Sequence, residues 1–94
     1  MNCITIKVKR LPGSEDLPLP KYETKGAVGM DLLAAVTGDV TIEPGETAII
    51  PSGIALAVPD GFEAQIRPRS GLASNYKISI LNSPGTIDSD YRGV

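Results

Sequence analysis

The chain has 94 residues, of which 41% are hydrophobic, 21% charged and 4% aromatic, and its net charge is −2. This length predicts one domain over residues 1–94 with an aliphatic core. The absence of histidine excludes Ser-His and Cys-His catalysis and the usual zinc sites, and one cysteine excludes an internal disulfide. The weak charge argues against nucleic-acid binding, and no apolar run could span a membrane, so we expect a cytoplasmic protein.

The first part of the chain predicts a strand followed by a long connection. Residues 3–9 alternate between apolar and polar side chains, which is typical of a half-buried strand. Residues 10–28 are rich in proline and glycine, so we expect a long loop that is functional or pinned to a neighbour. Residues 27–36 could form a short buried helix, but Gly29 and the strand pattern of the surrounding segments favour a strand.

Two proline-glycine turns in the middle of the chain each separate two short strand patterns. The turns are at residues 43–46 and 59–61, and the strands are predicted at 40–42, 47–51, 54–58 and 62–67. Each turn with its flanking strands predicts a β-hairpin. Short strands at such regular spacing indicate an all-β sandwich or barrel. The only helical turn that we expect covers residues 70–75, with Ser70 as its cap.

The stretch 80–93 gathers two acids, an amide, a phenol and a guanidinium around the turn signal Pro84-Gly85. Apolar runs at 78–81 and 91–94 frame this stretch, which therefore predicts a β-hairpin with polar groups along one arm. A hairpin of this kind can hold a flat ligand with its backbone and place a carboxylate beside it.

Two side chains of this hairpin have the chemistry of a nucleotide site. Asn82 carries both a donor and an acceptor, which match the edge of a nucleobase. Asp88 can orient and deprotonate a water beside a bound phosphate. Residues 88–93 superficially resemble a calcium loop, but Arg92 stands where an oxygen ligand is needed, so we reject a calcium site.

Two further clusters carry charged side chains. Residues 67–71, Arg-Pro-Arg-Ser-Gly, end a strand with two guanidiniums before a helical turn, which suits a phosphate cradle. The alternative for this segment is a strand end with solvated arginines and an ordinary serine cap. Asp31 lies inside an apolar stretch and could equally be a turn or edge aspartate that is solvated or paired with an arginine.

Three segments together resemble the trimeric deoxyuridine triphosphate nucleotidohydrolases, the dUTPases. They are Ala27-Val-Gly29-Met-Asp31-Leu32, Arg67-Pro68-Arg69-Ser70-Gly71-Leu72-Ala73 and Asn82-x-x-Gly85-x-Ile87-Asp88-x-Asp90-Tyr91-x-Gly93. These match the first three of that family's five motifs, in order, and the resemblance covers essentially the whole chain. The segment from Leu17 to Tyr22 is also similar.

The resemblance implies a jelly-roll-like β-sandwich or barrel of the dUTPase type, assembled as a homotrimer with sites between subunits. The implied reaction is hydrolysis of dUTP to dUMP and diphosphate, with Mg²⁺ carried on the triphosphate and no direct protein ligand to the metal. Thymine would be excluded by its methyl group against a tight hairpin wall, and cytosine by its reversed edge.

The resemblance also implies a role for each motif residue. Uracil would be read by Asn82 and by the hairpin backbone at Gly85, Thr86 and Ile87. The phosphates would be held by Arg69, Ser70 and Gly71, supported by Asp31. Asp88 would position the attacking water against the α-phosphate, and Tyr91 would stack on the deoxyribose and leave no room for a 2′-hydroxyl.

This chain departs from the family pattern in two respects. Residues 73–78 hold Lys77 and no histidine, and the fourth and fifth motifs, which family members carry beyond the position of Val94, are not present. We therefore expect an N-terminal fragment or truncated relative with reduced or no activity alone and with doubtful trimer formation. The alternatives are a non-catalytic nucleotide-binding fragment, a relative of dCTP deaminase, or a purely structural β-domain.

Overall fold

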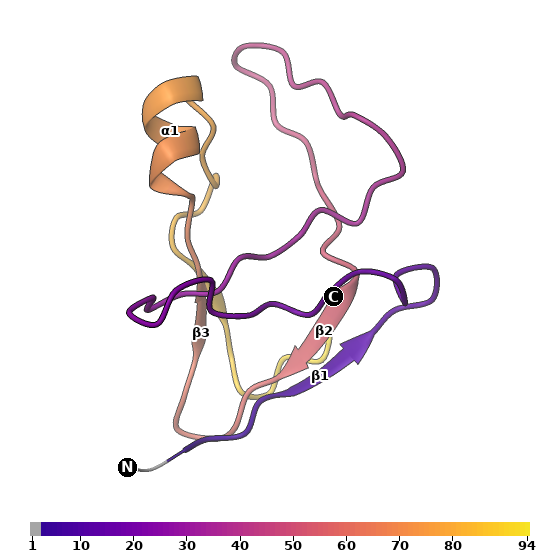
Figure 1. The fold of residues 1–94 in the computed structure, drawn as a ribbon, viewed down its shortest axis with the longest axis vertical. Coiled ribbons are helices and arrows are strands. Elements are labelled where there is room, and N and C mark those ends of the chain that lie inside the picture. Colours follow the sequence, from indigo (N-terminus) through magenta and orange to yellow (C-terminus); the bar gives the residue numbers. More distant parts are fainter. Residues whose placement is uncertain (1–2) are drawn as a thin grey trace. The chain divides into compact units, whose positions relative to one another are not determined.

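A computed structural model describes residues 3–94 of the chain (Figure 1). Regular structure in this part consists of β1 (Lys7–Arg10), β2 (Ile54–Ala57), β3 (Ala64–Ile66), α1 (Ser70–Tyr76) and β4 (Gly85–Ile87). The strands form two two-stranded sheets, in which β1 pairs with β2 and β3 pairs with β4. Most of the remaining described chain consists of turns and irregular segments.

The chain divides into two compact units. The first unit covers Val8–Ala55 together with Val94. Within it, the Leu11 N–H donates to the Gly53 carbonyl at 2.9 Å, and the Ala35 N–H donates to the Pro51 carbonyl at 2.8 Å. Gly53 has a φ of +75°, which residues with a side chain rarely adopt. A Cβ there would also lie 2.6 Å from the Ser14 hydroxyl oxygen, so only glycine fits at this position.

The second unit covers Leu56–Gly93 together with residues 3–7. Its sheet is antiparallel, with Ala64 opposite Ile87, Gln65 opposite Thr86 and Ile66 opposite Gly85. The central pair, Gln65 and Thr86, is exposed, whereas the flanking pairs are at least partly buried. This alternation agrees with the two-residue period of a strand and gives the sheet one polar face and one apolar face.

Helix α1 lies directly downstream of β3 and ends where the backbone turns left-handed at Lys77, with φ of 60°. The Lys77 N–H donates to the Ala73 carbonyl at 3.1 Å, and the Ile78 N–H donates to the Leu72 carbonyl at 3.2 Å. These two bonds satisfy carbonyls at the helix end that would otherwise lack partners. The predicted helical turn at residues 70–75 is therefore confirmed, but Ser70 is its first residue rather than its cap.

The predicted hairpins are wrong in their pairing, although both turns form. Glu46 donates to the Glu43 carbonyl at 3.0 Å and Phe62 to the Pro59 carbonyl at 3.2 Å, each turn closing around a glycine of positive φ. However, β2 pairs with β1 instead of β3, and β4 pairs with β3 instead of another part of 78–94. Turn formation is local, whereas strand pairing depends on which edges meet after the chain folds.

Several predicted strands do not form in the described chain. Residues 27–36, 40–42, 47–51, 78–81 and 91–94 have neither strand nor helix structure, and of residues 3–9 only the last three belong to β1. The predicted sandwich or barrel is accordingly reduced to two small sheets. A strand that finds no hydrogen-bonding partner remains irregular, because its backbone groups are then satisfied by water instead.

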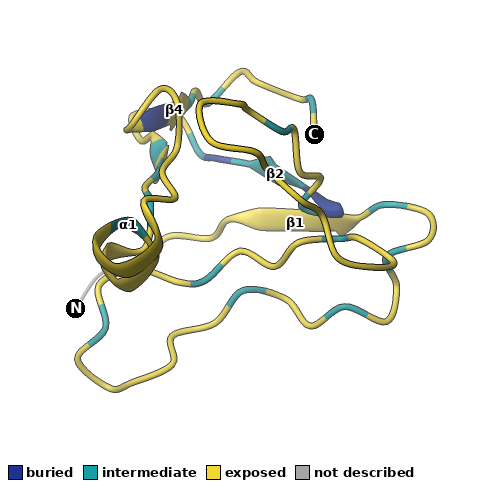
Figure 2. Cartoon of the chain, turned by 90° about the horizontal axis from the view of Figure 1, so that it is seen from above, coloured by how far each residue is buried: buried dark blue, intermediate teal, exposed yellow. Residues whose placement is uncertain are grey.

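Burial is limited to a few positions, which Figure 2 shows in dark blue. Among the described residues, the buried hydrophobic side chains are Ile54 and Val58, at 7% and 3% exposure. The apolar side chains of the predicted first strand, Ile4, Ile6 and Val8, keep 49%, 42% and 39% of their surface exposed, so that strand is not half-buried. Ile54 and Val58 are therefore the hydrophobic side chains of the described residues that are most completely removed from water.

Candidate nucleotide-binding site

The amide of Asn82 lies against the first residue of β4. A Cβ built on Gly85 would lie 3.6 Å from the Asn82 side-chain nitrogen and 3.6 Å from the Ile66 Cβ. Gly85 is buried and occupies no positive-φ conformation, and a Cβ there would be in ordinary van der Waals contact with these two atoms. The structure thus brings together two of the residues that the sequence assigns to base recognition, at the beginning of β4.

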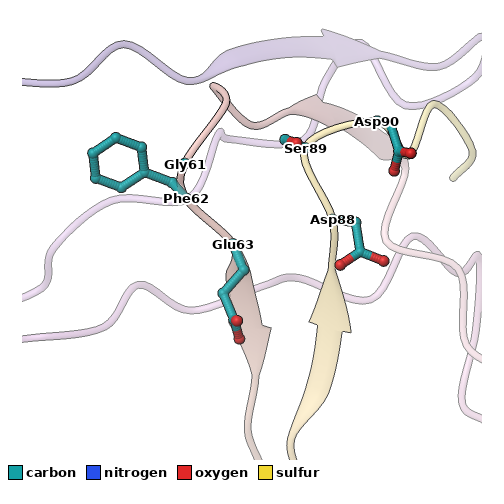
Figure 3. Close-up of a pocket in the computed structure, with 6 residues that line it drawn as sticks. All are labelled: Gly61, Phe62, Glu63, Asp88, Ser89 and Asp90. Carbon is teal, nitrogen blue, oxygen red and sulfur yellow. The ribbon is translucent and has the colours of Figure 1, made fainter.

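Asp88 follows the other end of β4 and is exposed. Continuing the strand register by one residue places it opposite Glu63, and both line an open pocket of about 530 Å³ (Figure 3). The remaining lining residues are Gly61, Phe62, Ser89 and Asp90. The pocket is therefore lined by three carboxylates, those of Glu63, Asp88 and Asp90, and by a half-exposed phenylalanine.

A chain of side-chain hydrogen bonds runs along the polar face of β3. Arg67 Nη2 donates to Gln65 Oε1 at 2.8 Å, and Gln65 Nε2 donates to Glu63 Oε1 at 2.9 Å. Glu63, Gln65 and Arg67 are alternate residues and therefore share one face of the strand. Their hydrogen bonds link the Glu63 carboxylate at the pocket to the Arg67 guanidinium near α1. Sequence reasoning missed Glu63 and Gln65, although the alternation Glu-Ala-Gln-Ile-Arg carried the signal that they share a face.

The segment after β4 folds into a tight turn that carries Tyr91. The Tyr91 N–H donates to the Asp88 carbonyl at 3.1 Å. Arg92 Nη1 donates to the carbonyls of Ser89 and Tyr91, at 2.8 Å each. The guanidinium of Arg92 therefore holds the turn together from within, and Tyr91 retains 45% of its surface exposed.

The predicted phosphate cradle lies at the start of α1. Arg69 is the residue before the helix, with extended backbone angles of −76° and 130°, and no side chain caps the helix start. Ser70 and Gly71 form the first turn, which contains no acidic residue, and all three side-chain positions are exposed. The predicted serine cap is wrong, because the helix begins at Ser70 itself and Arg69 occupies the capping position without a side-chain cap.

One copy of the chain does not bring Asp88 and the cradle into a common pocket. Asp88 lies beyond the Ala64–Ile87 pair, and Arg69 lies beyond the opposite, Ile66–Gly85 end of the ladder. At roughly 3.3 Å per residue, the stretch from Glu63 to Arg69 spans about 20 Å when extended. Asp31 is half-buried and belongs to the first unit, so this structure relates it to neither cluster.

The donor groups of the described chain do not form a protein cage for a metal ion. Over residues 3–94, no three histidine, cysteine or acidic side chains are gathered closely enough to hold one. A Mg²⁺ ion commonly takes few protein ligands and completes its coordination with substrate phosphates and water, which is the type of binding expected for a Mg²⁺ carried on a triphosphate. In the same range of residues, no helix has the length and apolar character needed to cross a membrane.

Comparison with known proteins gives consistent results for sequence and structure. The family model described as dUTPase matches residues 15–94. The deoxyuridine 5′-triphosphate nucleotidohydrolase of Caldanaerobacter subterraneus is 61% identical over 90 residues, which cover 96% of this chain and 61% of that protein. The enzyme of the same name from Rhizobium etli is 58% identical over 91 residues, which cover 95% of this chain and 58% of the relative.

The structural match agrees with these relatives. The dUTPase of Staphylococcus bacteriophage 80alpha superimposes with a TM-score of 0.80 at 34% identity, covering 95% of this chain and 54% of the phage chain. This match confirms the predicted dUTPase-type fold. The chain spans about 60% of the length of the curated relatives that it matches. With a family model covering residues 15–94 and relatives near 60% identity, the chain belongs to the dUTPase family.

Proposed function

We propose that the protein binds deoxyuridine nucleotides and supplies the base-reading and water-positioning part of a site that hydrolyses dUTP to dUMP and diphosphate. One observation carries the proposal. Strand β4, within the residues matched by the dUTPase family model, has the Asn82 amide against its first residue and Asp88 directly after its last. The amide that we propose to read the base and the carboxylate that we propose to position the water thus lie at the two ends of one short strand.

Uracil recognition follows from the edge that β4 presents. The strand belongs to a two-stranded sheet, so one of its sides pairs with β3 and the other is an edge with unpaired backbone groups. Backbone groups of successive strand residues point to alternate sides, so part of the groups at Gly85, Thr86 and Ile87 faces this edge. Together with the Asn82 amide, these groups can complement the alternating acceptors and donor of a uracil edge. Cytosine would leave a buried donor or acceptor unpaired, which typically costs about 1–3 kcal/mol.

Asp88 would serve as the base in the chemical step. It orients a water whose oxygen bonds to the α-phosphorus while the bond from that phosphorus to the bridging α–β oxygen breaks. The diphosphate leaves with the bridging oxygen, and the water proton passes to the Asp88 carboxylate. Glu63, the carboxylate opposite it, is hydrogen-bonded to Gln65, which supports Asp88 as the group that faces the water.

The phosphate contacts would come from a second copy of the chain. Asp88 and the segment Arg69–Gly71 lie at opposite ends of the β3–β4 ladder, so one copy cannot place both around a single triphosphate. We propose that the site forms between copies, as the homotrimer implied for the family would allow. Bound Mg²⁺, held mainly by the triphosphate, would neutralise part of its charge.

Calorimetry with nucleoside monophosphates tests base recognition. We expect the 94-residue chain to bind dUMP more tightly than dTMP, dCMP or UMP, and we expect Asn82→Ala to weaken dUMP binding about tenfold or more, since a lost partner leaves a polar group unpaired. Asn75→Ala is the matched control, because Asn75 is an exposed amide on α1, away from β4. Equal losses in both variants, or no preference for dUMP, would contradict the proposal. Ammonia release from dCTP would instead favour a deaminase.

Ser70 offers a test that separates phosphate binding from helix stability. Since its side chain makes no capping hydrogen bond, we expect Ser70→Ala to change the free energy of unfolding by less than about 0.5 kcal/mol. Loss of a hydrogen bond to a charged phosphate should weaken binding of a non-hydrolysable dUTP analogue about tenfold. Thermal unfolding and calorimetry measure the two effects, with Ser74→Ala on the same helix as control. A loss of more than about 1 kcal/mol in the free energy of unfolding would instead show that the Ser70 side chain caps the helix.

A further inference from the structure

The ring of Tyr91 is seated directly on Gly93. A Cβ built on Gly93 would collide with the phenol oxygen and Cζ of Tyr91 and would come within 3.0 Å of its Cε1. Gly93 is not among the glycines of positive φ, so its backbone conformation is open to any residue. The requirement for glycine at this position is therefore steric, and it comes from the tyrosine two residues earlier.

The backbone around Tyr91 is held in place by hydrogen bonds. Its N–H is bonded to the Asp88 carbonyl at 3.1 Å, and its carbonyl accepts from Arg92 Nη1 at 2.8 Å. The same guanidinium binds the Ser89 carbonyl at 2.8 Å, which closes the turn on both sides of Tyr91. A side chain added at Gly93 would consequently rotate the ring out of its position, because the backbone is pinned and the ring itself is rigid.

We propose that Gly93 is a positioning residue for sugar recognition. Because it has no side chain, the Tyr91 ring packs directly on its Cα, and this contact fixes the orientation of the ring. The inference rests on the proposed function, in which Tyr91 stacks on the deoxyribose. It adds that discrimination against a 2′-hydroxyl depends on a residue that does not touch the nucleotide. A ring displaced from this contact would lose stacking area on deoxyribose and would open space for ribose.

The test is Gly93→Ala, compared with Gly38→Ala as a matched control. A Cβ at Gly38 meets nothing within 4 Å, and its φ is not positive, so the control makes the same chemical change without the collision. Affinities for dUMP and UMP are measured by calorimetry on the 94-residue chain. We expect Gly93→Ala to weaken dUMP binding about tenfold, since small displacements at a site have large effects, and to reduce the dUMP-to-UMP preference. Gly38→Ala should leave both within about twofold, as is usual for surface changes.

A second measurement reports the contact between the Tyr91 ring and Gly93, independently of nucleotide binding. The ring of Tyr91 should shift the Gly93 α-proton resonances in the NMR spectrum of the free wild-type chain, and Tyr91→Leu should abolish that shift. Tyr91 ring resonances should move in Gly93→Ala and stay in place in Gly38→Ala. Unmoved resonances, or a wild-type dUMP-to-UMP preference in Gly93→Ala, would overturn the inference. If the wild-type chain binds neither nucleotide while the ring shift is present, the proposed function fails and the sugar role of Gly93 fails with it.

Discussion

Under the proposed function, replacing Asp88 with asparagine should remove most of the dUTP turnover of the chain while leaving nucleotide binding nearly unchanged. Asparagine keeps the shape of the side chain and can still hydrogen-bond to a water, but it cannot accept the proton that the water must lose. General-base catalysis of this kind is typically worth about 10²–10⁴ in rate. Because Asp88 is exposed and lies after the strand, the substitution removes no buried contact, and we expect the fold to be retained.

The measurement is diphosphate release with Mg²⁺ and with the chain in large excess over dUTP, so that slow turnover is also detected. Asp60→Asn serves as the control, since Asp60 lies in the exposed turn before β3 and does not line the pocket around Asp88. Equal turnover in Asp88→Asn and wild type would exclude Asp88 as the base. A wild-type chain that binds dUMP but releases no diphosphate would support the non-catalytic nucleotide-binding alternative.

Replacing Ile54 with alanine should destabilise the chain by about 2–4 kcal/mol, the usual range for deleting a buried aliphatic side chain. Ile54 is 7% exposed and begins β2, and it shares the apolar burial of the described residues with Val58. Domains of ordinary stability have only about 5–15 kcal/mol in total, so a loss of this size would remove a large fraction of it. Urea unfolding followed by circular dichroism gives the free-energy difference.

Ile49 provides the matched comparison for this prediction. It is the same residue type in the same unit, but it is 96% exposed, so Ile49→Ala should change stability by less than about 0.5 kcal/mol. Comparable losses for both variants would show that Ile49 is covered in solution, for example by a second copy of the chain. The contrast between the two substitutions therefore tests the distribution of burial as well as the role of Ile54.

Local features of the fold were predicted correctly from local signals. The helical turn at 70–75 and the turns at 43–46 and 59–61 form as expected, because each depends on the backbone preferences of a few adjacent residues. The positions of β2 and β3 were also close to the predicted strands, 54–58 and 62–67. Membership of the dUTPase family was equally accessible, since motif residues and their spacing are properties of the sequence itself.

The sequence alone therefore determined the family, the turns and the helix, and it supplied the candidate residues for nucleotide binding. Only the tertiary structure decided that β3 pairs with β4, which places Glu63 beside Asp88 and separates Asp88 from Arg69. It also decided that the Tyr91 ring lies on Gly93. The physical reason is that turns and caps depend on neighbours along the chain, whereas strand register and side-chain contact depend on segments that meet only once the chain has folded.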